Sequence, residues 1–290
     1  METTLEGSTA LVTGATAGIG RAVALQLAAL GAEVVVHGRS AERGAKTVQE
    51  IENAGGKARF VAADLSEADA LRRLAVEAGP VDILINNAGV YKFGPTADTD
   101  DAFFDEHINI NLRAPYILVQ QLVPGMAARG AGVVVNISTL AAAVPARMAG
   151  IYGASKAGLE LLTRVWADEF GRSGVRVNAV QAGPTETPGT AASPGLAESF
   201  ATVTTLGRVT QADEIANAVT FLASPQASYI NARSCKPMAD NWRSPPSGWE
   251  TFTDPAPGRR RARPSRSALH PRRALPAAVA RRSSPRRPRR

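Results

Sequence analysis

The sequence predicts an α/β fold, in which short buried strands alternate with helices along the first 230 residues. Hydrophobic residues make up 44% of the chain but aromatic residues only 5%, a balance that suits this class. A buried strand at residues 9–13 leads directly into a glycine-rich turn and then into a helix. At 290 residues, the chain is long enough to bury the core of one large domain, or of two.

Apolar runs and turn signals give the elements in order. Strands are predicted over residues 9–13, 33–37, 58–62, 81–85, 133–137 and 175–180, and helices over 21–30, 41–54, 66–78, 101–126, 154–171 and from about 210 to 223. Pro115 is expected to bend the long helix. The spacing Thr210-x-x-Asp213 is typical of a capping box at the start of the last helix. Residues 188–199 are small and proline-rich, so we expect a mobile segment that could cover a ligand.

Positive charge is concentrated at the end of the chain. Residues 231–290 carry 15 Arg, one Lys and three acidic residues, a balance of +13, which leaves −6 for residues 1–230. Ten prolines and low hydrophobicity predict that residues 231–290 are disordered. The sequence therefore divides into a folded domain over 1–230 and a basic Arg/Pro-rich tail over 231–290.

Several classes of protein are excluded. No apolar run approaches the roughly 18 residues of a membrane span, and the first residues lack the basic start of a signal peptide. We expect a soluble, cytoplasmic protein. Cys235 is the single cysteine, which excludes an internal disulfide framework. The three histidines, His37, His107 and His270, have no metal-ligand spacing, so no metal site is predicted.

The turn Gly14-Ala15-Thr16-Ala17-Gly18-Ile19-Gly20 follows the first strand and precedes the first helix. At such a place, backbone N–H groups and the helix dipole face a phosphate that no side chain blocks. Three glycines near a helix can also form a simple tight turn. Their position between a buried strand and a helix favours a dinucleotide site.

Residues at the ends of the second and third strands indicate which dinucleotide binds. An acidic residue at the end of the second strand would bind a ribose 2′-hydroxyl, whereas an arginine accommodates a 2′-phosphate. Arg39 stands there with no carboxylate, which favours NADP over NAD; the alternative is a solvated arginine. Asp64, followed by Leu65, could bind an adenine amine or cap the next helix.

Polar residues also follow the fourth and fifth strands. Asn86-Asn87-Ala88-Gly89 would let backbone approach a ligand closely, although a plain turn is the alternative. Asn111 lies among apolar residues of a predicted helix, so it is either exposed or placed for its polar group. Ser138 and Thr139 end the fifth strand, at the sheet edge where ligands of open α/β sheets collect.

Tyr152 and Lys156 are spaced to share one face of a helix, one turn apart. A phenol ordinarily ionises near pH 10, and a fixed positive charge beside it would lower that pKa toward the range of a useful base. The alternative for an isolated Tyr-x-x-x-Lys is a helix turn with a surface lysine.

Together these residues resemble the short-chain dehydrogenase/reductase family over about residues 5–230. The matching motifs are Thr13-Gly14-x-x-x-Gly18-Ile19-Gly20, Asn86-Asn87-Ala88-Gly89, Asn111, Tyr152-x-x-x-Lys156, and Gly183-Pro184 with Thr187. The resemblance implies one doubly wound Rossmann domain with a parallel sheet. It also implies NAD(P)-dependent hydride transfer between a nicotinamide and a carbonyl or alcohol, and a homo-oligomer, either a dimer or a tetramer.

The resemblance assigns roles to individual residues. Tyr152 would be the acid/base, Lys156 would lower its pKa and hold the nicotinamide ribose, and Asn111 would support a water-linked proton path. The family's serine stands 13 residues before the tyrosine, and here that position is Thr139. We expect Thr139 to hold the substrate oxygen, because strand alternation points Ser138 to the other face.

The predicted site residues fall into catalytic, substrate-binding and cofactor-binding groups. Catalytic residues are Asn111, Thr139, Tyr152 and Lys156, and substrate contacts are Ser138, Thr139 and Tyr152. Predicted cofactor contacts are Gly14, Thr16, Gly18, Ile19, Gly20, Arg39, Asp64, Leu65, Asn87, Ala88, Gly89, Tyr152, Lys156, Gly183, Thr185 and Thr187.

The sequence departs from the resemblance after residue 230, where a last buried strand and an Asp-Gly-Gly turn are expected. One back-translation of Ala232 to Arg243, read two nucleotides later, encodes Ala-Val-Leu-Gln-Ala-Asp-Gly-Gly-Gln-Leu-Ala. A one-nucleotide deletion near codon 232 would explain this, and the last strand would then be lost or replaced.

Two alternative functions follow from this ending of the sequence. Without an intact last strand, the chain could be a catalytically impaired dinucleotide-binding protein. The basic tail could instead bind nucleic acid non-specifically through phosphate contacts, with Trp242 and Trp249 available for stacking.

Overall fold

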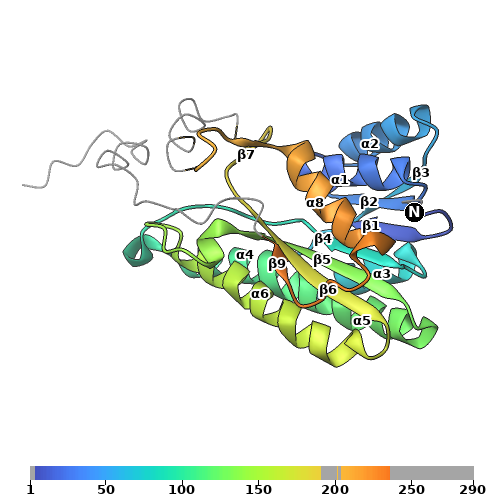
Figure 1. Cartoon of the computed structure of the whole chain (residues 1–290). Helices are drawn as coiled ribbons and strands as arrows, with labels where there is room; N and C mark the ends of the chain where they lie inside the picture. Colours follow the sequence, from blue (N-terminus) through green and yellow to red (C-terminus); the bar gives the residue numbers. More distant parts are fainter. Residues whose placement is uncertain (1–3, 191–200, 202–203, 236–290) are drawn as a thin grey trace, which may run out of the picture. The chain divides into compact units, whose positions relative to one another are not determined.

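The computed structural model describes residues 4–190, 201 and 204–235 (Figure 1). The part of the predicted mobile segment over 191–199, and the tail from residue 236, lie outside the described residues. Seven parallel strands form one sheet in the order β3-β2-β1-β4-β5-β6-β9. The strands are β1 (Thr9–Val12), β2 (Glu33–Gly38), β3 (Lys57–Ala62), β4 (Ile83–Asn86), β5 (Gly132–Thr139), β6 (Val175–Ala182) and β9 (Ser234–Cys235).

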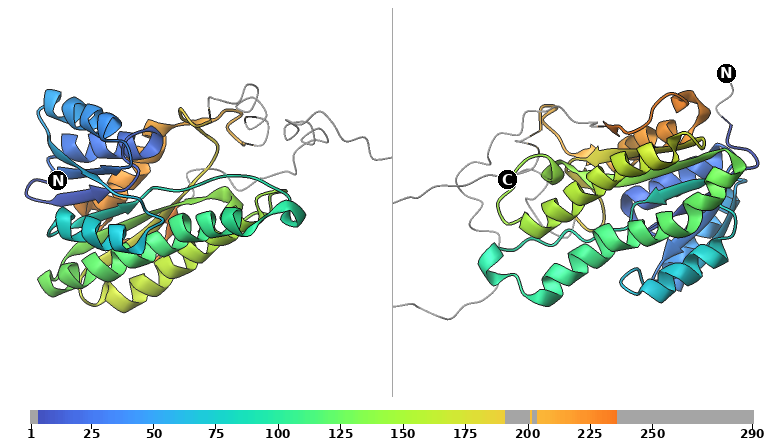
Figure 2. Two further views of the ribbon diagram at one scale, coloured as in Figure 1. Left: turned by 180° about the vertical axis from the view of Figure 1, so that it is seen from behind. Right: turned by 90° about the horizontal axis from the view of Figure 1, so that it is seen from below.

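Helices cover both faces of this sheet, as Figures 1 and 2 show. One face carries α1 (Gly18–Ala29), α2 (Ala41–Asn53) and α8 (Ala212–Ala223), and the other carries α3 (Ala68–Ala78), α5 (Ala114–Arg129) and α6 (Gly150–Gly171). The helix α4 (Asp101–Ile108) precedes α5, and β7 (Thr185–Glu186) and β8 (Thr210–Gln211) form a separate two-stranded sheet. The predicted α/β class with a doubly wound parallel sheet is confirmed.

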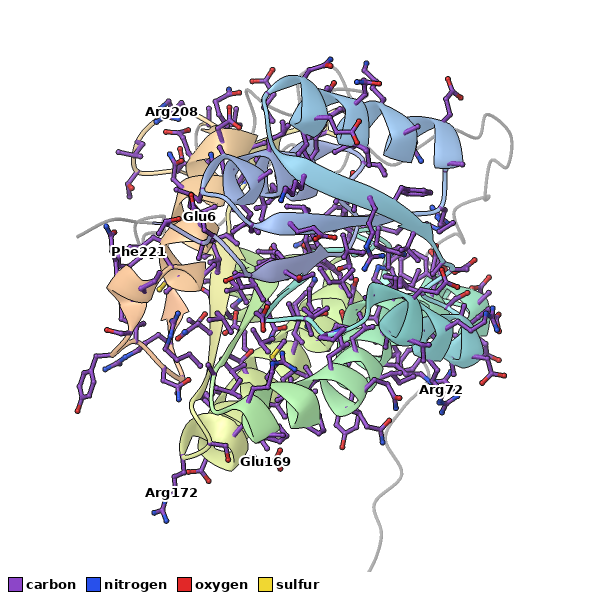
Figure 3. The ribbon with its side chains drawn as sticks, turned by 90° about the vertical axis from the view of Figure 1, so that its right-hand side faces the viewer. Glu6, Arg72, Glu169, Arg172, Arg208 and Phe221 are labelled. Carbon is purple, nitrogen blue, oxygen red and sulfur yellow. The ribbon has the colours of Figure 1, made fainter. Side chains whose placement is uncertain are left out.

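The sheet is buried on both faces, so two cores form. Successive residues of a strand point to opposite faces: Val12 packs into the core under α1 and α8, and its neighbour Leu11 packs into the core under α3, α5 and α6. This double burial explains why the strands read as continuous apolar runs. Side chains fill the space between the sheet and its helices (Figure 3). The strand order reverses between β1 and β4, the place where ligands of such sheets bind.

The helix predicted over residues 101–126 is interrupted. Between α4 and α5 lies one π-helical turn, Asn109–Arg113, and Pro115 occupies the first turn of α5. Proline has no N–H to donate, and its ring would clash with the carbonyl four residues earlier in an α-helix. The expected bend is therefore replaced by a wider turn just before Pro115, and this turn contains Asn111.

The capping box of the last helix lies one residue later than predicted. Gln211 and Glu214 form it, with the Gln211 backbone N–H donating to the Glu214 carboxylate at 2.9 Å. Thr210 instead pairs with Thr185 in the small sheet, which shifts the start of the helix. Glu214 also accepts from Arg208, labelled in Figure 3, and this hydrogen bond lowers the pKa of Glu214 to about 2.

Within residues 204–235, the last strand of the sheet, β9, has two residues. They pair with Ala179 and Val180 of the eight-residue β6. Asn231 holds the approach to β9, because its Oδ1 accepts from the Val177 N–H at 2.8 Å. The sheet therefore extends beyond residue 230, as far as Cys235. Within the described residues, no helix is both long and apolar enough to cross a membrane.

Candidate active site

The glycine-rich turn packs directly against the loop that follows β4. Gly14 and Gly18 have φ of +65° and +52°, a left-handed backbone that favours glycine. A Cβ on Gly20 would lie 2.3 Å from Asn87 Nδ2 and 2.4 Å from the Gly14 carbonyl oxygen. The turn therefore has no room for a side chain at position 20.

Thr13 and Asn87 hold the two loops together at the point where the strand order reverses. The Thr13 hydroxyl accepts from the backbone N–H groups of Asn87 at 3.0 Å and Ala88 at 3.1 Å. In return, Asn87 Nδ2 donates to the carbonyl oxygens of Thr13 at 2.9 Å and Gly14 at 3.2 Å. The amide of Asn87 is thus part of the scaffold beneath the glycine-rich turn.

His37 links the same turn to β3. Its Nδ1 accepts from the Gly14 N–H at 3.2 Å, so Nε2 carries the proton and donates to the Ala63 carbonyl at 3.2 Å. The side chain is 2% exposed, and burial lowers the pKa of His37 to about 4. The imidazole is therefore neutral at physiological pH, which is the form that can accept from Gly14.

The lowered pKa of His37 predicts a loss of stability in acid. Because its folded-state pKa lies below the ordinary 6.5, the unfolded chain binds the proton more tightly. The contribution of neutral His37 to the free energy of unfolding is complete above pH 6.5 and is lost as the pH falls toward 4. Between about pH 7.5 and 5, this one group should lower the free energy of unfolding by about 2 kcal/mol. In urea unfolding, His37→Gln should lose less free energy of unfolding than the parent over this pH range, by the amount given above. Equal losses of free energy in the variant and the parent would contradict the prediction.

Arg39 and Asp64 lie near one another at the ends of β2 and β3. The Arg39 charge contributes to lowering the pKa of Asp64, although the hydrogen bond from the Ser66 N–H is the main cause. Asp64 Oδ1 accepts from that N–H at 2.9 Å, so a turn before α3 uses this oxygen. Thr16 packs over Gly38, where a Cβ would lie 2.5 Å from the Thr16 methyl. The Leu65 side chain is buried in the core, which leaves its backbone for a ligand.

Helix α6 starts at Gly150, so Tyr152 and Lys156 lie in successive turns of one helix. The Thr139 hydroxyl lies close enough to the Tyr152 hydroxyl to lower its pKa. The Tyr152 ring makes edge contacts with Phe93 and His107, with centroids 5.8 and 6.3 Å away. Lys156 is 4% exposed, and its Nζ donates to the Ile137 carbonyl at 2.8 Å. Lys156 is therefore buried at the end of β5 and is no surface lysine, and Tyr152 is partly buried beside it.

Burial dominates the ionisation of both groups. It raises the pKa of Tyr152, and the hydrogen bond with Thr139 lowers that pKa to a smaller extent. Burial also lowers the pKa of Lys156 to about 8. The shift at Tyr152 is opposite to the one expected from Lys156, because loss of solvent disfavours the phenolate. The phenol is consequently protonated at neutral pH.

Asn111 is placed for its polar group. It is fully buried, its Oδ1 accepts from the Val90 N–H at 2.9 Å, and its Nδ2 donates to the Val90 carbonyl at 2.9 Å. The same Nδ2 donates to Ser155 Oγ at 3.1 Å, and Ser155 donates to the Tyr152 carbonyl at 2.8 Å. Asn111 therefore braces the loop after β4 against the first turns of α6.

Ser138 and Thr139 lie against different points of α6. Thr139 meets Tyr152, whereas Ser138 is 3% exposed and donates to Glu160 Oε1 at 2.6 Å. Ser138 is thus not brought to the Tyr152 hydroxyl.

The loop after β6 reaches the glycine-rich turn. A Cβ on Gly18 would lie 3.1 Å from the Thr187 methyl. The Thr185 hydroxyl donates to the Gly183 carbonyl at 2.9 Å, which shapes this loop locally. Ile19 packs against the core beneath α1. Gly89 approaches Lys156, where a Cβ would lie 3.3 Å from Nζ. The residues predicted to bind cofactor therefore lie at the carboxyl ends of β1, β2, β3, β4 and β6 and on α6.

Three residues with clear roles in this arrangement were not among the predicted sites: Thr13, His37 and Glu160. Thr13 and His37 are polar residues that end buried strands, a signal that the sequence does contain. Glu160 gives no comparable signal, since an acidic residue on a helix usually faces solvent.

Comparison with known proteins identifies close relatives. Residues 8–195 match the family described as short chain dehydrogenase. The galactitol 2-dehydrogenase (L-tagatose-forming) of Cereibacter sphaeroides is 37% identical over 234 residues, which cover 78% of this chain and 91% of that relative.

Two solved structures share the fold. A short chain dehydrogenase/reductase family protein is 49% identical with a TM-score of 0.76, and the match covers 81% of this chain and 97% of that protein. The 3-oxoacyl (acyl-carrier-protein) reductase of Agrobacterium tumefaciens C58, crystallised with NADP bound, is 32% identical with a TM-score of 0.77. That match covers 80% of this chain and 93% of the reductase.

Proposed function

The chain belongs to the short-chain dehydrogenase/reductase family, and from that premise we propose that it transfers hydride between NADP and a carbonyl or alcohol, with Tyr152 as acid/base. The observation that carries this proposal is the position of Tyr152, with its hydroxyl beside Thr139 and one helical turn from the buried Lys156. The two alternatives considered from the sequence, an impaired dinucleotide-binding protein and a nucleic-acid-binding chain, are not favoured.

The residues at the start of α1 fit a dinucleotide. Among the described residues, no side chain caps the N-terminus of α1, and its first turn has no acidic residue. Its unpaired N–H groups are therefore available to a diphosphate. Gly14, Gly18 and Gly20 would hold that diphosphate, with Thr16 and Arg39 toward the adenosine and Lys156 toward the nicotinamide ribose. A nicotinamide bound there supplies or accepts the hydride.

In the direction of reduction, the side chains around Tyr152 manage a proton and a developing negative charge. Burial keeps Tyr152 protonated, which is the form that can donate to the substrate oxygen as that oxygen becomes an alkoxide. Thr139 offers a second hydroxyl to the same oxygen. Lys156 is held by the Ile137 carbonyl, which fixes its charge beneath the site. Asn111 keeps the loop and α6 in place.

A substrate panel tests the reaction. We expect NADPH consumption with at least one of a ketose, a 3-oxoacyl thioester and a cyclic ketone. The first two classes are suggested by the names of the C. sphaeroides and A. tumefaciens relatives. Absence of turnover with every carbonyl, and with the matching alcohols and NADP, would contradict the proposed function.

NADP is the proposed cofactor because Arg39 is exposed at the end of β2 beside Thr16, and positions 37–40 offer no carboxylate. Arg39→Ala should weaken NADPH binding about 10- to 100-fold, the value of one charge-assisted contact, and change NADH binding by less than about 3-fold. Fluorescence titration measures both. Arg43→Ala, another exposed arginine one turn away on α2, is the control and should leave both affinities unchanged. Equal losses for the two cofactors would argue against a 2′-phosphate contact.

We also propose a homo-oligomer whose interface includes the outer surface of α5 and α6. Tyr116, Leu161 and Val165 are 51%, 55% and 40% exposed there, and Tyr116 packs against Trp166 at 5.9 Å. Neighbouring exposed apolar side chains of this size mark interfaces. Light scattering should show that Leu161→Asp with Val165→Asp reduces the mass of the assembly. Val76→Asp, at a more exposed valine on α3, should leave it unchanged. The cytoplasmic location stays a prediction from the sequence.

A further inference from the structure

Glu160 joins α6 to two strands at once. It lies one turn beyond Lys156, is 9% exposed, and its Oε1 accepts from Ser138 Oγ and Gln181 Nε2, both at 2.6 Å. Ser138 and Gln181 are directly paired neighbours on β5 and β6. One carboxylate oxygen therefore connects the helix that carries Tyr152 to the ends of the two strands beneath it.

The Gln181 amide indicates that this connection is specific. Its Oε1 is buried and has no hydrogen-bond partner among the described residues, so its orientation is set by the bond to Glu160. Elsewhere α6 meets the sheet mainly through apolar contacts. Such contacts are not directional, so they do not by themselves fix the position of the helix along its axis. Two further polar links join α6 to β5: Lys156, which donates to the Ile137 carbonyl at 2.8 Å, and Thr163, which accepts from Asn136 at 2.8 Å farther along the helix.

We propose that Glu160 is a positioning residue, which holds α6 on β5 so that Tyr152 stays within hydrogen-bonding reach of Thr139. Glu160 is eight residues from Tyr152, about 12 Å along the helix, so it acts without touching the reacting groups. Ser138 and Thr139 are adjacent on β5, and the bond from Ser138 to Glu160 therefore fixes the strand at the position next to Thr139. The proposal rests on the proposed function of Tyr152.

Two substitutions separate the hydrogen bonds from the charge. Glu160→Gln keeps a side chain of the same length with one acceptor oxygen. Because Ser138 and Gln181 both donate to a single oxygen of Glu160, that oxygen is enough for both, and kcat should stay within about 3-fold of the parent. Glu160→Leu removes the acceptor, and a displacement of the order of 1 Å can lower kcat by about 10²-fold. The dissociation constant of NADPH should change much less than kcat in both, because Lys156 is the only proposed dinucleotide residue besides Tyr152 that lies on α6.

Glu160→Leu leaves two buried donors unpaired and can fail to fold. The triple variant Glu160→Leu, Ser138→Ala, Gln181→Leu removes the donors as well, and replacing all partners by apolar groups can restore stability. We expect this variant to be folded by circular dichroism and still to have low kcat. A folded triple variant with the kcat of the parent would overturn the proposal.

A spectroscopic measurement separates this proposal from the proposed function. The hydrogen bond with Thr139 lowers the pKa of Tyr152, so losing it should raise that pKa further. Ultraviolet titration against a Tyr152→Phe reference should show this rise in the triple variant and not in Glu160→Gln. If the parent is inactive but the triple variant shows the rise in the pKa of Tyr152, only the proposed function is contradicted. If the parent is active but the triple variant shows no rise, the role of Glu160 is contradicted.

The edge strand β9 carries a second inference independently. Ala232 has a φ of +61°, in the left-handed region that favours glycine. Ser234 Oγ is buried and finds no hydrogen-bond partner within the described part of the chain. Cys235 packs against the core beneath α1 and α8. Position 232 therefore suits glycine better than Ala232, and positions 234 and 235 suit apolar residues better than Ser234 and Cys235.

The displaced reading frame supplies those residue types. Every alanine codon begins with GC, and every asparagine codon ends in T or C, so position 232 is glycine in the displaced frame when the deleted nucleotide is a G between the codons of Asn231 and Ala232. A TCN serine codon at 234 gives a displaced codon ending in TC, which encodes Val, Leu, Ile or Phe. Every cysteine codon begins with TG, so position 235 becomes Leu, Met or Val. We infer that residues from about 232 are read out of frame and that the intact edge strand starts with glycine and two apolar residues.

The gene and the protein both test this inference. The nucleotide sequence should hold an open displaced frame that encodes an apolar residue at 234 and, farther on, the expected Asp-Gly-Gly turn. A charged residue at 234, or a stop codon before that turn, would overturn the inference. In the full chain, Ala232→Gly should raise Tm by about 2–4 °C. Ser234→Val should raise Tm as well, because it removes an unpaired buried hydroxyl. A lower Tm in both variants would also contradict the inference.

Discussion

Tyr152→Phe is expected to lower kcat by about 10³-fold, within the range that general acid catalysis contributes. The substitution removes the hydroxyl that meets Thr139 and keeps the ring that contacts Phe93 and His107. The free energy of unfolding and the NADPH dissociation constant should therefore change little. Single-turnover measurement of NADPH oxidation with a saturating carbonyl substrate gives the value directly.

The matched control is Tyr229→Phe, a fully exposed tyrosine, which should retain the kcat of the parent. Thr139→Ser keeps the hydroxyl and should retain most activity, whereas Thr139→Val should lose about 10- to 100-fold, because one hydrogen bond to a charged oxygen disappears. If Tyr152→Phe turns over as fast as the parent, Tyr152 is not the proton donor.

Gly20→Ala is expected to weaken NADPH binding at least about 100-fold and to lower the free energy of unfolding by about 1–3 kcal/mol, the usual cost of an overpacked site. The new methyl would meet Asn87 Nδ2 at 2.3 Å and the Gly14 carbonyl at 2.4 Å. Both neighbours belong to the connection between the loops after β1 and β4, so neither can move alone. Fluorescence titration and urea unfolding measure the two effects.

Gly125→Ala is the control for this substitution. Gly125 lies within α5, and the nearest atom to its Cβ would be Arg129 Nη1 at 3.5 Å, an ordinary contact. In a helix, alanine is favoured over glycine by about 1 kcal/mol, so this variant should be at least as stable as the parent. Unchanged NADPH affinity in Gly20→Ala would mean that the turn does not hold the dinucleotide.

Local patterns predicted most of the fold because each strand and helix has a recognisable pattern of apolar residues within its own sequence. The buried strands around Val12 and Val135 read as apolar runs, and the structure differs by one to four residues at element ends. The long helix was the main exception. Its π-helical turn depends on how Pro115 is accommodated after Asn111, and apolar spacing does not reveal that choice.

The candidate site was predictable where its residues share an element or end a strand. The placement of Tyr152 and Lys156 on one helix follows from their spacing. Strand alternation does not explain why Thr139 lies beside Tyr152, because Ser138 also contacts α6. Contacts between distant elements were not predictable. Glu160 meets Ser138 22 residues away and Gln181 21 residues away, and nothing in its local sequence indicates either partner.

The π-helical turn before α5 makes this segment tolerant of one change in chain length. The wide turn holds one residue more than an α-helical turn does, so deleting one residue there would return the segment to an α-helix. Leu118 and Leu122 would then stay in the core that they fill beneath the sheet. The same deletion within α5 itself would rotate everything after it by about 100° and misalign the rest of the helix.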